Sequence, residues 1–299
     1  MKSKPKNILI TGGSGFIGSH IVDQCIEQGY NVKILDIKEP HRNDVEFING
    51  DVTDRPILTK IMVDIDYIYH LAAVSNIDYV IDKPIETIEY NIMGTAFLLE
   101  EARKNQIKRF FLASSVFVYE KSGHLYTSSK QYSEILCNNY FLLYGIPYTI
   151  LRFATVYGPR SRGVDVISKF VKNAFEGKSL IVNGQGTQKR NFIYVKDLAR
   201  GSVRAINATN TANKILTIAG KKSISIIDLA KQVNMIFNES VKIESNNKEL
   251  REHDYKGDIN DIDKTYLILG WEPKVSLNNG IKKYAKWYSS SIFDPETKK

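Results

Sequence analysis

Short apolar runs alternate with amphipathic stretches through the first half of the chain. The apolar runs lack the two-residue alternation of a half-exposed strand, and they predict buried strands at 7–11, 31–36, 45–49, 67–73, 109–116 and 148–154. The amphipathic stretches between them predict helices near 16–28, 54–63, 89–104 and 128–144. Strands that alternate with helices in this way predict an α/β fold, in which a parallel sheet is covered on both faces.

The second half of the chain has a less regular pattern. Helical patterns near 165–177, 194–206 and 225–237 are separated by a glycine-rich turn at 184–187 and a strand pattern at 214–219. A last helix follows Pro273 and ends near Tyr288. We predict that residues 1–157 form one domain, that segments near 191–220 return to it, and that residues 158–299 form mainly a smaller α/β lobe.

The composition is that of a globular protein, with 43% hydrophobic and 25% charged residues and no apolar run as long as a membrane span. We therefore expect a cytoplasmic protein without a membrane partner. The net charge is +8, but the basic residues are scattered, which favours a solvated surface over nucleic-acid binding. Cys25 and Cys137 lie far apart without metal-ligand spacing, which argues against a disulfide framework and a metal site.

Three glycines, Gly12, Gly15 and Gly18, stand between the first predicted strand and the first predicted helix. In this spacing the first allows a tight turn, the second lets the backbone approach a pyrophosphate, and the third lets the helix pack on the strand. Asp36 ends the second predicted strand, where a carboxylate would bind ribose hydroxyls and repel a 2′-phosphate. We therefore predict a Rossmann-type, doubly wound sheet that binds NAD rather than NADP. An ordinary polar residue at a strand end is the alternative interpretation of Asp36.

A second motif places Tyr126 and Lys130 four residues apart, so on a helix they share a face. A nearby ammonium, together with the positive nicotinamide ring, would favour the phenolate form of a tyrosine whose ordinary pKa is about 10. Ser115, at the end of the fifth predicted strand, could donate to the same substrate oxygen. A chance pair of surface side chains is the alternative interpretation, but the glycine motif and Asp36 favour proton transfer coupled to hydride transfer.

These motifs resemble the extended short-chain dehydrogenase/reductase family, in its NAD-dependent epimerase/dehydratase branch that acts on sugar nucleotides. The resemblance covers nearly the whole chain. The segments that carry it are Thr11–His20, Asp51–Val52, His70–Ala73, Asn91, Ser114–Tyr119, Leu151–Arg160, Arg190–Asp197 and Leu269–Pro273.

The resemblance implies roles for particular residues. The expected catalytic residues are Ser115, Tyr126 and Lys130. The expected NAD-binding residues are Gly12, Gly15, Phe16, Ile17, Asp36, Asp51, Val52, Leu71, Ala72, Ala73, Tyr126, Lys130 and Phe153. The smaller lobe is expected to bind the nucleotide-sugar substrate, and the substrate residues are expected to be Ser75, Ser115, Thr155, Arg190, Arg251 and Asp254. The resemblance also implies a homodimer, formed through the helices near 89–104 and 128–144.

Departures from the family pattern bear on the reaction. Val116 and Phe117 stand where the family's 4,6-dehydratases carry an acid pair, and ten residues separate Ser115 from Tyr126, fewer than usual. Thr155 replaces the usual asparagine. His124 is either a second acid/base or a solvated loop residue. The resemblance therefore implies a sugar-nucleotide 4-epimerase acting by transient hydride transfer at C4. The alternatives are a 4-dehydrogenase or 4-ketoreductase and, less favoured, a 4,6-dehydratase or a catalytically dead NAD-binding protein.

Overall fold

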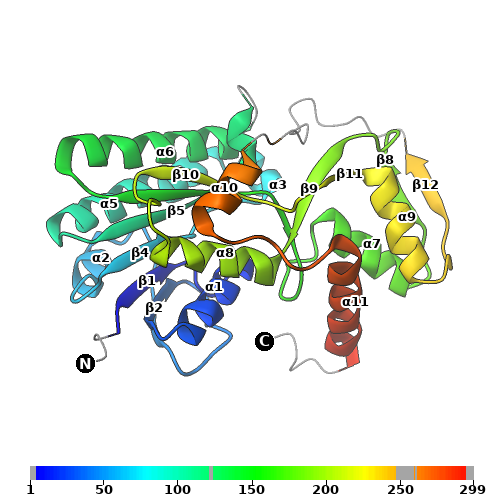
Figure 1. The fold of residues 1–299 in the computed structure, drawn as a ribbon, viewed down its shortest axis with the longest axis horizontal. Coiled ribbons are helices and arrows are strands. Elements are labelled where there is room, and N and C mark those ends of the chain that lie inside the picture. Colours follow the sequence, from blue (N-terminus) through cyan, green and yellow to red (C-terminus); the bar gives the residue numbers. More distant parts are fainter. Residues whose placement is uncertain (1–4, 121–123, 247–258, 260, 294–299) are drawn as a thin grey trace.

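A parallel sheet of seven strands forms the larger part of the molecule (Figure 1). The computed structural model describes residues 5–120, 124–246, 259 and 261–293. The strand order is β10-β6-β5-β4-β1-β2-β3, and every neighbouring pair runs parallel. The strands are β1 (Asn7–Thr11), β2 (Asn31–Asp36), β3 (Glu46–Asn49), β4 (Tyr67–His70), β5 (Arg109–Ser115), β6 (Tyr148–Phe153) and β10 (Lys214–Ile218).

Helices cover both faces of this sheet. One face packs on α1 (Phe16–Glu27) and α8 (Val195–Asn207), and the other on α2 (Arg55–Ile61), α5 (Gly94–Lys104) and α6 (Leu125–Tyr144). Alternate residues of β1 show why its apolar run is continuous: Ile8 and Ile10 enter the first core, whereas Leu9 enters the second. A strand buried on both faces needs apolar side chains at successive positions.

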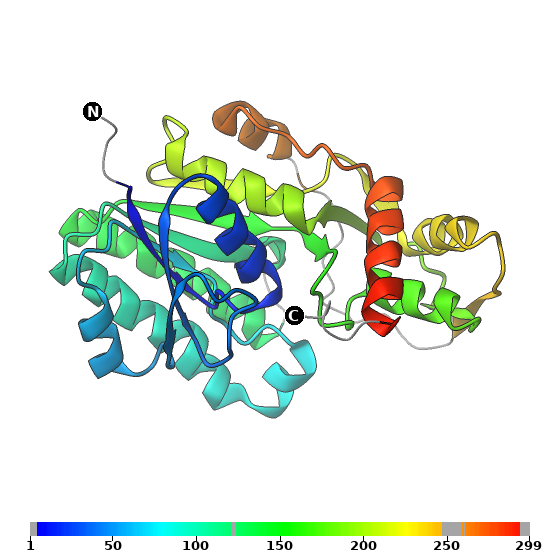
Figure 2. The same ribbon diagram turned by 90° about the horizontal axis from the view of Figure 1, so that it is seen from below.

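The second part of the molecule contains two small sheets at the opposite end from α5 and α6 (Figures 1 and 2). One has the order β11-β9-β7, built from β7 (Thr155–Tyr157), β9 (Lys189–Tyr194) and β11 (Ser223–Ser225). The other pairs β8 (Leu180–Asn183) with β12 (Ile243–Asn246). Their shared core also contains side chains of α7 (Val166–Phe175), α9 (Ile226–Ile236) and α11 (Leu277–Phe293).

The α/β fold and its parallel sheet are confirmed, and the differences from prediction lie at element boundaries and in short elements. The expected strand 67–73 ends at His70, and α6 begins at Leu125 because His124 caps its first turn. The expected helix 89–104 opens with a π-helix, η1 (Glu89–Met93). The short elements that the pattern missed are β7, β8, β9, β11, β12, α3 (Ile77–Asp82), α4 (Pro84–Ile88), α10 (Ile262–Leu269) and the 3₁₀ turn η2 (Val116–Tyr119).

The chain crosses between the two parts more than once. β10 joins the large sheet beside β6, and α8 packs on α1, whereas β9 belongs to the three-stranded sheet. α10 comes late in the chain and packs on β10 and α8. The domain division at residue 157 stays a prediction. Within the described residues, no helix is long and apolar enough to cross a membrane, and the location of the protein in the cell also stays a prediction.

Candidate NAD and catalytic site

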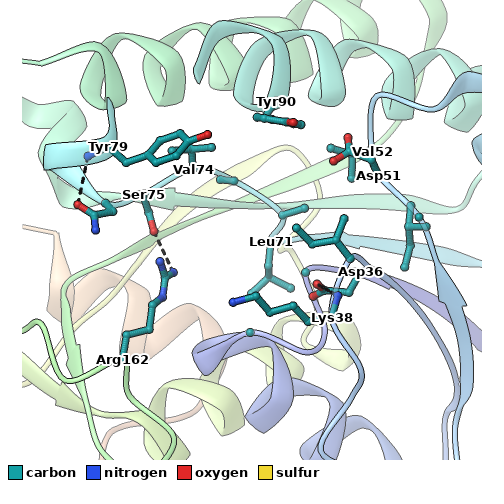
Figure 3. Close-up of a pocket in the computed structure, with 18 residues that line it drawn as sticks. Asp36, Lys38, Asp51, Val52, Leu71, Val74, Ser75, Tyr79, Tyr90 and Arg162 are labelled. Carbon is teal, nitrogen blue, oxygen red and sulfur yellow. Dashed lines mark hydrogen bonds between the residues drawn. The ribbon is translucent and has the colours of Figure 1, made fainter. Parts of the chain in front are cut away.

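A cavity of about 530 Å³ opens beside the carboxyl ends of β1, β2 and β4 (Figure 3). Ligands bind at this edge of open parallel sheets. Eight of the expected NAD-binding residues line it together: Gly12, Gly15, Asp36, Asp51, Val52, Leu71, Ala72 and Ala73. The fold therefore gathers residues from four separate loops, which the sequence could associate only through their motifs.

The glycine loop is built as its spacing predicts. Gly12 has a φ of 73°, and a Cβ there would lie 2.6 Å from the backbone nitrogen of Ala72. A Cβ on Gly18 would overlap the carbonyl oxygen of Gly12, so the helix packs directly on the turn. Gly15 is the N-cap of α1 and lines the cavity, so the positive end of the helix faces it. This cradle fits the phosphates of NAD.

Asp36 is held by the backbone on both sides. Its Oδ2 accepts a hydrogen bond of 3.0 Å from the Ser14 N–H, and its Oδ1 accepts one of 3.0 Å from the Lys38 N–H. The carboxylate thereby fastens the glycine loop to the end of β2. Because an ionised carboxylate has about four acceptor sites, it can still accept a ribose hydroxyl.

The remaining expected NAD residues lie outside the lining of this cavity. Phe16 and Ile17 begin α1, and Phe153 is buried at the end of β6, where it pairs in register with Ser115. Tyr126 and Lys130 lie on α6. Phe153, Tyr126 and Lys130 therefore belong to the catalytic corner, beside β5 and β6, rather than to the cavity wall.

A buried asparagine supports the loop that follows β4. The side chain of Asn91, in η1, donates to the Val74 carbonyl at 2.9 Å and accepts from the Val74 N–H at 2.7 Å. It also donates to the Ser129 hydroxyl on α6 at 3.0 Å. Single π-helical turns often occur at functional sites. Here Asn91 links the cavity wall to the helix that carries Tyr126 and Lys130.

Ser115 and Tyr126 lie within hydrogen-bonding distance of each other. Ser115 is buried at the end of β5, and its hydrogen bond to Tyr126 favours the phenolate. The pKa of Tyr126 is nevertheless raised, because burial of the phenol outweighs this hydrogen bond and the positive charge of Arg162. Tyr126 is therefore protonated at neutral pH in this structure. In the protein alone the pKa is therefore not lowered, since desolvation is the largest effect, and the expected contribution of a bound nicotinamide ring stays a prediction.

Lys130 is buried beneath Tyr126. Its Nζ lies 6.0 Å from the centre of the Tyr126 ring and donates a hydrogen bond of 2.9 Å to the Ala113 carbonyl. Burial lowers the pKa of Lys130 to about 8, and the nearby Glu134 carboxylate opposes this shift. The ammonium is thus charged at neutral pH but close to losing its proton.

The expected substrate residues are placed in three groups. Ser75 lines the cavity, where its hydroxyl accepts a hydrogen bond of 3.1 Å from Arg162 (Figure 3). Thr155 and Arg190 lie on the adjacent strands β7 and β9, in which Thr155 pairs with Phe192. Arg190 is 8% exposed and donates to the Lys189 carbonyl at 2.7 Å. Ser115 lies at the catalytic corner, at the end of β5, and Arg251 and Asp254 lie outside the described residues.

Sequence reasoning missed several residues of the cavity wall. Arg162 follows the motif that ends at Arg160, and Tyr90 precedes Asn91. Their positions next to recognised motifs are the sequence feature that could have identified both. The other missed residues lie on β2, on α3 and on the connections after β2, β3 and β4; the full set is Leu35, Ile37, Lys38, Gly50, Val74, Asn76, Tyr79, Tyr90 and Arg162. Arg162 is the most informative, because it lines the cavity and also acts electrostatically on Tyr126.

His124 caps the helix α6. Its Nδ1 accepts a hydrogen bond of 3.3 Å from the Thr127 N–H, which caps the first turn of α6. Its ring centre lies 5.9 Å from that of Tyr126. Neither role considered for His124 in the sequence analysis, an acid/base or a solvated loop residue, includes this cap.

Residues 8–219 match the NAD dependent epimerase/dehydratase family. The chain is 35% identical to a putative UDP-glucose 4-epimerase of Methanocaldococcus jannaschii, over 95% of this chain and 99% of that protein. It is 32% identical to UDP-glucuronic acid decarboxylase 3 of Arabidopsis thaliana, over 92% and 86% of the two chains. It also resembles the crystal structure of UDP-glucuronic acid 4-epimerase from Bacillus cereus in complex with UDP-glucuronic acid and NAD. That comparison has a TM-score of 0.87 and 31% identity, and it covers 95% of this chain and 99% of the other.

The site and the comparisons agree. The glycine cradle and the carboxylate at the end of β2 fit NAD, and the family match spans both the cavity and the catalytic corner. The chain belongs to the NAD-dependent epimerase/dehydratase family and is an NAD-dependent enzyme of the extended short-chain dehydrogenase/reductase type.

Proposed function

We propose that this enzyme is a sugar-nucleotide 4-epimerase. The observation that carries the proposal is the hydrogen bond between Ser115 and Tyr126, with Lys130 one helical turn further along α6. It places a hydroxyl, a phenol and an ammonium together at the sheet edge that also carries the NAD cavity. The putative UDP-glucose 4-epimerase of M. jannaschii and the UDP-glucuronic acid 4-epimerase of B. cereus support the reaction class.

The proposed roles follow from the positions of the side chains. Tyr126, in the phenolate form that the positive charges of Lys130 and of bound NAD⁺ would favour, takes the proton from the C4 hydroxyl of the sugar, and Ser115 donates a hydrogen bond that orients the same oxygen. Bound NAD⁺ supplies a hydride acceptor and, after reduction, a donor to the opposite face of the sugar. Lys130 holds the cofactor ribose and supplies positive charge beneath Tyr126. In the second half of the cycle Tyr126 returns its proton to the C4 oxygen.

The absence of an acid pair argues against dehydration. Val116 and Phe117 follow Ser115 in η2, and Val116 is buried in an apolar cluster with Phe117 packed against it. A 4,6-dehydratase of this family carries carboxyl groups at these positions. The 4-dehydrogenase and 4-ketoreductase alternatives use the same three catalytic residues, so the products must separate them from an epimerase.

Substrate anchoring is proposed to involve Arg190. Its guanidinium lies on β9, next to the strand that carries Thr155, and planar guanidinium groups bind diphosphate oxygens in pairs. Ser75, on the cavity wall, is proposed to contact the substrate from the opposite side. Arg251 and Asp254 are proposed to hold the nucleotide, as in the family pattern.

The test is a panel of UDP-, GDP-, CDP- and dTDP-sugars incubated with the purified enzyme. Because 4-epimers have equal mass, products are separated by chromatography and identified by proton NMR. We expect one nucleotide series to give a 4-epimer with no net change in absorbance at 340 nm. A lasting absorbance change would instead identify a net oxidoreductase, and loss of carbon dioxide would identify a decarboxylase.

A homodimer is the second part of this proposal. Apolar side chains stand exposed on α6 and on the neighbouring α3 and α4: Ile81, Ile85, Tyr132, Ile135, Leu142 and Leu143, which are 48–71% exposed. Exposed apolar residues concentrated on one set of helices are typical of an interface. We expect a dimer in analytical ultracentrifugation and a monomer for Leu142→Asp. A monomeric wild type would contradict the proposal.

A further inference from the structure

A buried ion pair lies directly behind the catalytic corner. Glu134 on α6 accepts two hydrogen bonds from the Arg152 guanidinium on β6, with Nε to Oε1 at 3.0 Å and Nη2 to Oε2 at 2.7 Å. It also accepts a hydrogen bond of 2.5 Å from the Ser114 hydroxyl on β5. Glu134 is 8% exposed, so these three hydrogen bonds hold its carboxyl group largely away from water.

This carboxylate shares a helix face with Lys130. The two residues are one turn apart on α6, and both are buried. Lys130 points its ammonium at the Ala113 carbonyl on β5, and the next residue of that strand, Ser114, donates to Glu134. The lysine and the glutamate are therefore fastened to successive residues of the strand that ends at Ser115.

The guanidinium is held in place from its other side. Arg152 lies 4.7 Å from the centre of the Tyr119 ring, and the Tyr119 hydroxyl is hydrogen-bonded to Thr217 and Asp261. A cation over an aromatic face is stabilised by the ring quadrupole. The ion pair is therefore part of a rigid arrangement that joins α6, β5, β6 and β10.

The charged and titratable groups around Lys130 are few in the part of the chain that the structure describes. Tyr126, Glu134 and Cys137 lie on its own helix, and His70 lies on β4. His70 is kept neutral, because burial and the Lys130 charge lower its pKa to about 3. Burial raises the pKa of the Cys137 thiol beyond the ordinary range. Glu134 is thus the acidic side chain that acts electrostatically on Lys130, from one turn along the same helix.

We propose that Glu134 is a positioning residue, which keeps the Lys130 ammonium charged and seated on the Ala113 carbonyl. The inference rests on the proposed function, because Lys130 is there assigned to the cofactor ribose and to Tyr126. Buried ammonium groups lose their proton unless a compensating negative charge is close. Arg152 holds the compensating carboxyl group in place through two hydrogen bonds from its guanidinium.

The first test measures the proton affinity of Lys130 in the absence of sugar. Titration of ¹³Cε,¹⁵Nζ-lysine-labelled protein by NMR follows Lys130, whose signal is identified by its loss in Lys130→Met. In Glu134→Gln we expect the proton affinity of Lys130 to fall about tenfold or more. A nearby opposite charge shifts the pKa of a buried group by about one unit or more, and this variant removes that charge. Ser114→Ala is the matched control: it removes one hydrogen bond to Glu134 and leaves every charge in place, so Lys130 should titrate as in wild type.

A second variant covers the case in which Glu134→Gln does not fold. Removing one member of a buried ion pair is strongly destabilising, whereas replacing both is often tolerated. The double variant Glu134→Gln/Arg152→Gln leaves no unpaired guanidinium and should also lower the proton affinity of Lys130. The proposal would be overturned if Lys130 titrated as in wild type in either folded variant. It would also be overturned if the proton affinity of Lys130 fell as much in Ser114→Ala as in Glu134→Gln.

The pH profile of turnover then links this effect to catalysis. Lys130 is protonated below its pKa of about 8, so turnover should fall as the pH rises through that value. In Glu134→Gln this falling limb should move to lower pH, and Glu134→Asp should move it back. Loss of stability without movement of the limb would show that Glu134 has a purely structural role. Because the NMR titration needs no sugar, it stays readable if the proposed epimerase activity fails.

Discussion

The seven-stranded sheet and the three-stranded sheet position functional residues in different ways. In the large sheet, β1, β2 and β4 each end in a loop that lines the NAD cavity, and the local motif that follows each strand is sufficient to identify it. In the small sheet, β7, β9 and β11 come from segments that are far apart in the chain, and β11 runs antiparallel to β9. Arg190 belongs to a local motif, but its neighbours in space are set by this assembly of distant segments.

We infer from this contrast that the two sheets have different functions. Repeated βα units present backbone N–H groups and strand-end side chains to a cofactor, which is shared by a whole family. The small sheet presents side chains such as Thr155 and Arg190, which can vary with the substrate. Changes at the large sheet should therefore alter NAD binding or chemistry, and changes at the small sheet should alter the KM of the sugar nucleotide.

The largest expected effect is that of Tyr126→Phe, which should lower kcat about 10²–10⁴-fold because it removes the general base. The ring contact with Phe117, 6.4 Å between centres, should survive, so circular dichroism should show a wild-type fold. Tyr132→Phe is the matched control, because Tyr132 is exposed on the same helix and should keep its activity. Near-normal kcat in folded Tyr126→Phe would mean that the proton leaves by another route, and His124 would be tested first.

Arg190→Ala tests the other side of the comparison. Loss of a charge-assisted contact of roughly 1.5–3 kcal/mol should raise the KM of the sugar nucleotide about 10–150-fold. NAD binding, measured by calorimetry, should stay unchanged. Lys189→Ala changes the neighbouring exposed cation and should have little effect. An unchanged KM with every active sugar nucleotide would show that Arg190 is not a substrate ligand.

Asp36→Ala should have the smallest effect on the enzyme, and it tests the role of the large sheet in cofactor binding. The change should relax the preference for NAD(H) over NADP(H), because the repulsion of a 2′-phosphate is lost. NAD affinity should also fall about tenfold, because two backbone hydrogen bonds that anchor the glycine loop disappear.

Asp36→Asn separates these two contributions. Its side-chain oxygen can still accept from one backbone amide, whereas the negative charge is gone. We expect part of the NAD affinity to return while the preference stays relaxed. Tighter binding of NADP(H) than of NAD(H) to the wild type would contradict the interpretation of Asp36.

Much of the cofactor side could be predicted from the sequence, because it depends on local rules. A strand buried on both faces needs a continuous apolar run, and a turn with positive φ packed against Ala72 needs glycine at position 12. Both requirements restrict which amino acids can stand at successive positions, so both can be recognised in the sequence. The short strands β7, β8, β9, β11 and β12 have three to six residues each, too few for a clear period.

The sequence by itself determined the parallel α/β sheet, the glycine cradle and the pairing of Tyr126 with Lys130 on one helix, because each is encoded over a few residues. The tertiary structure alone decided that Arg162 reaches Ser75 across the cavity wall and that Arg152 fastens Glu134 behind Lys130. It also decided the direction of the Tyr126 pKa, since the desolvation of a phenol depends on every segment packed around it. Contacts between distant segments and the burial they create have no local period, so the folded chain is needed to reveal them.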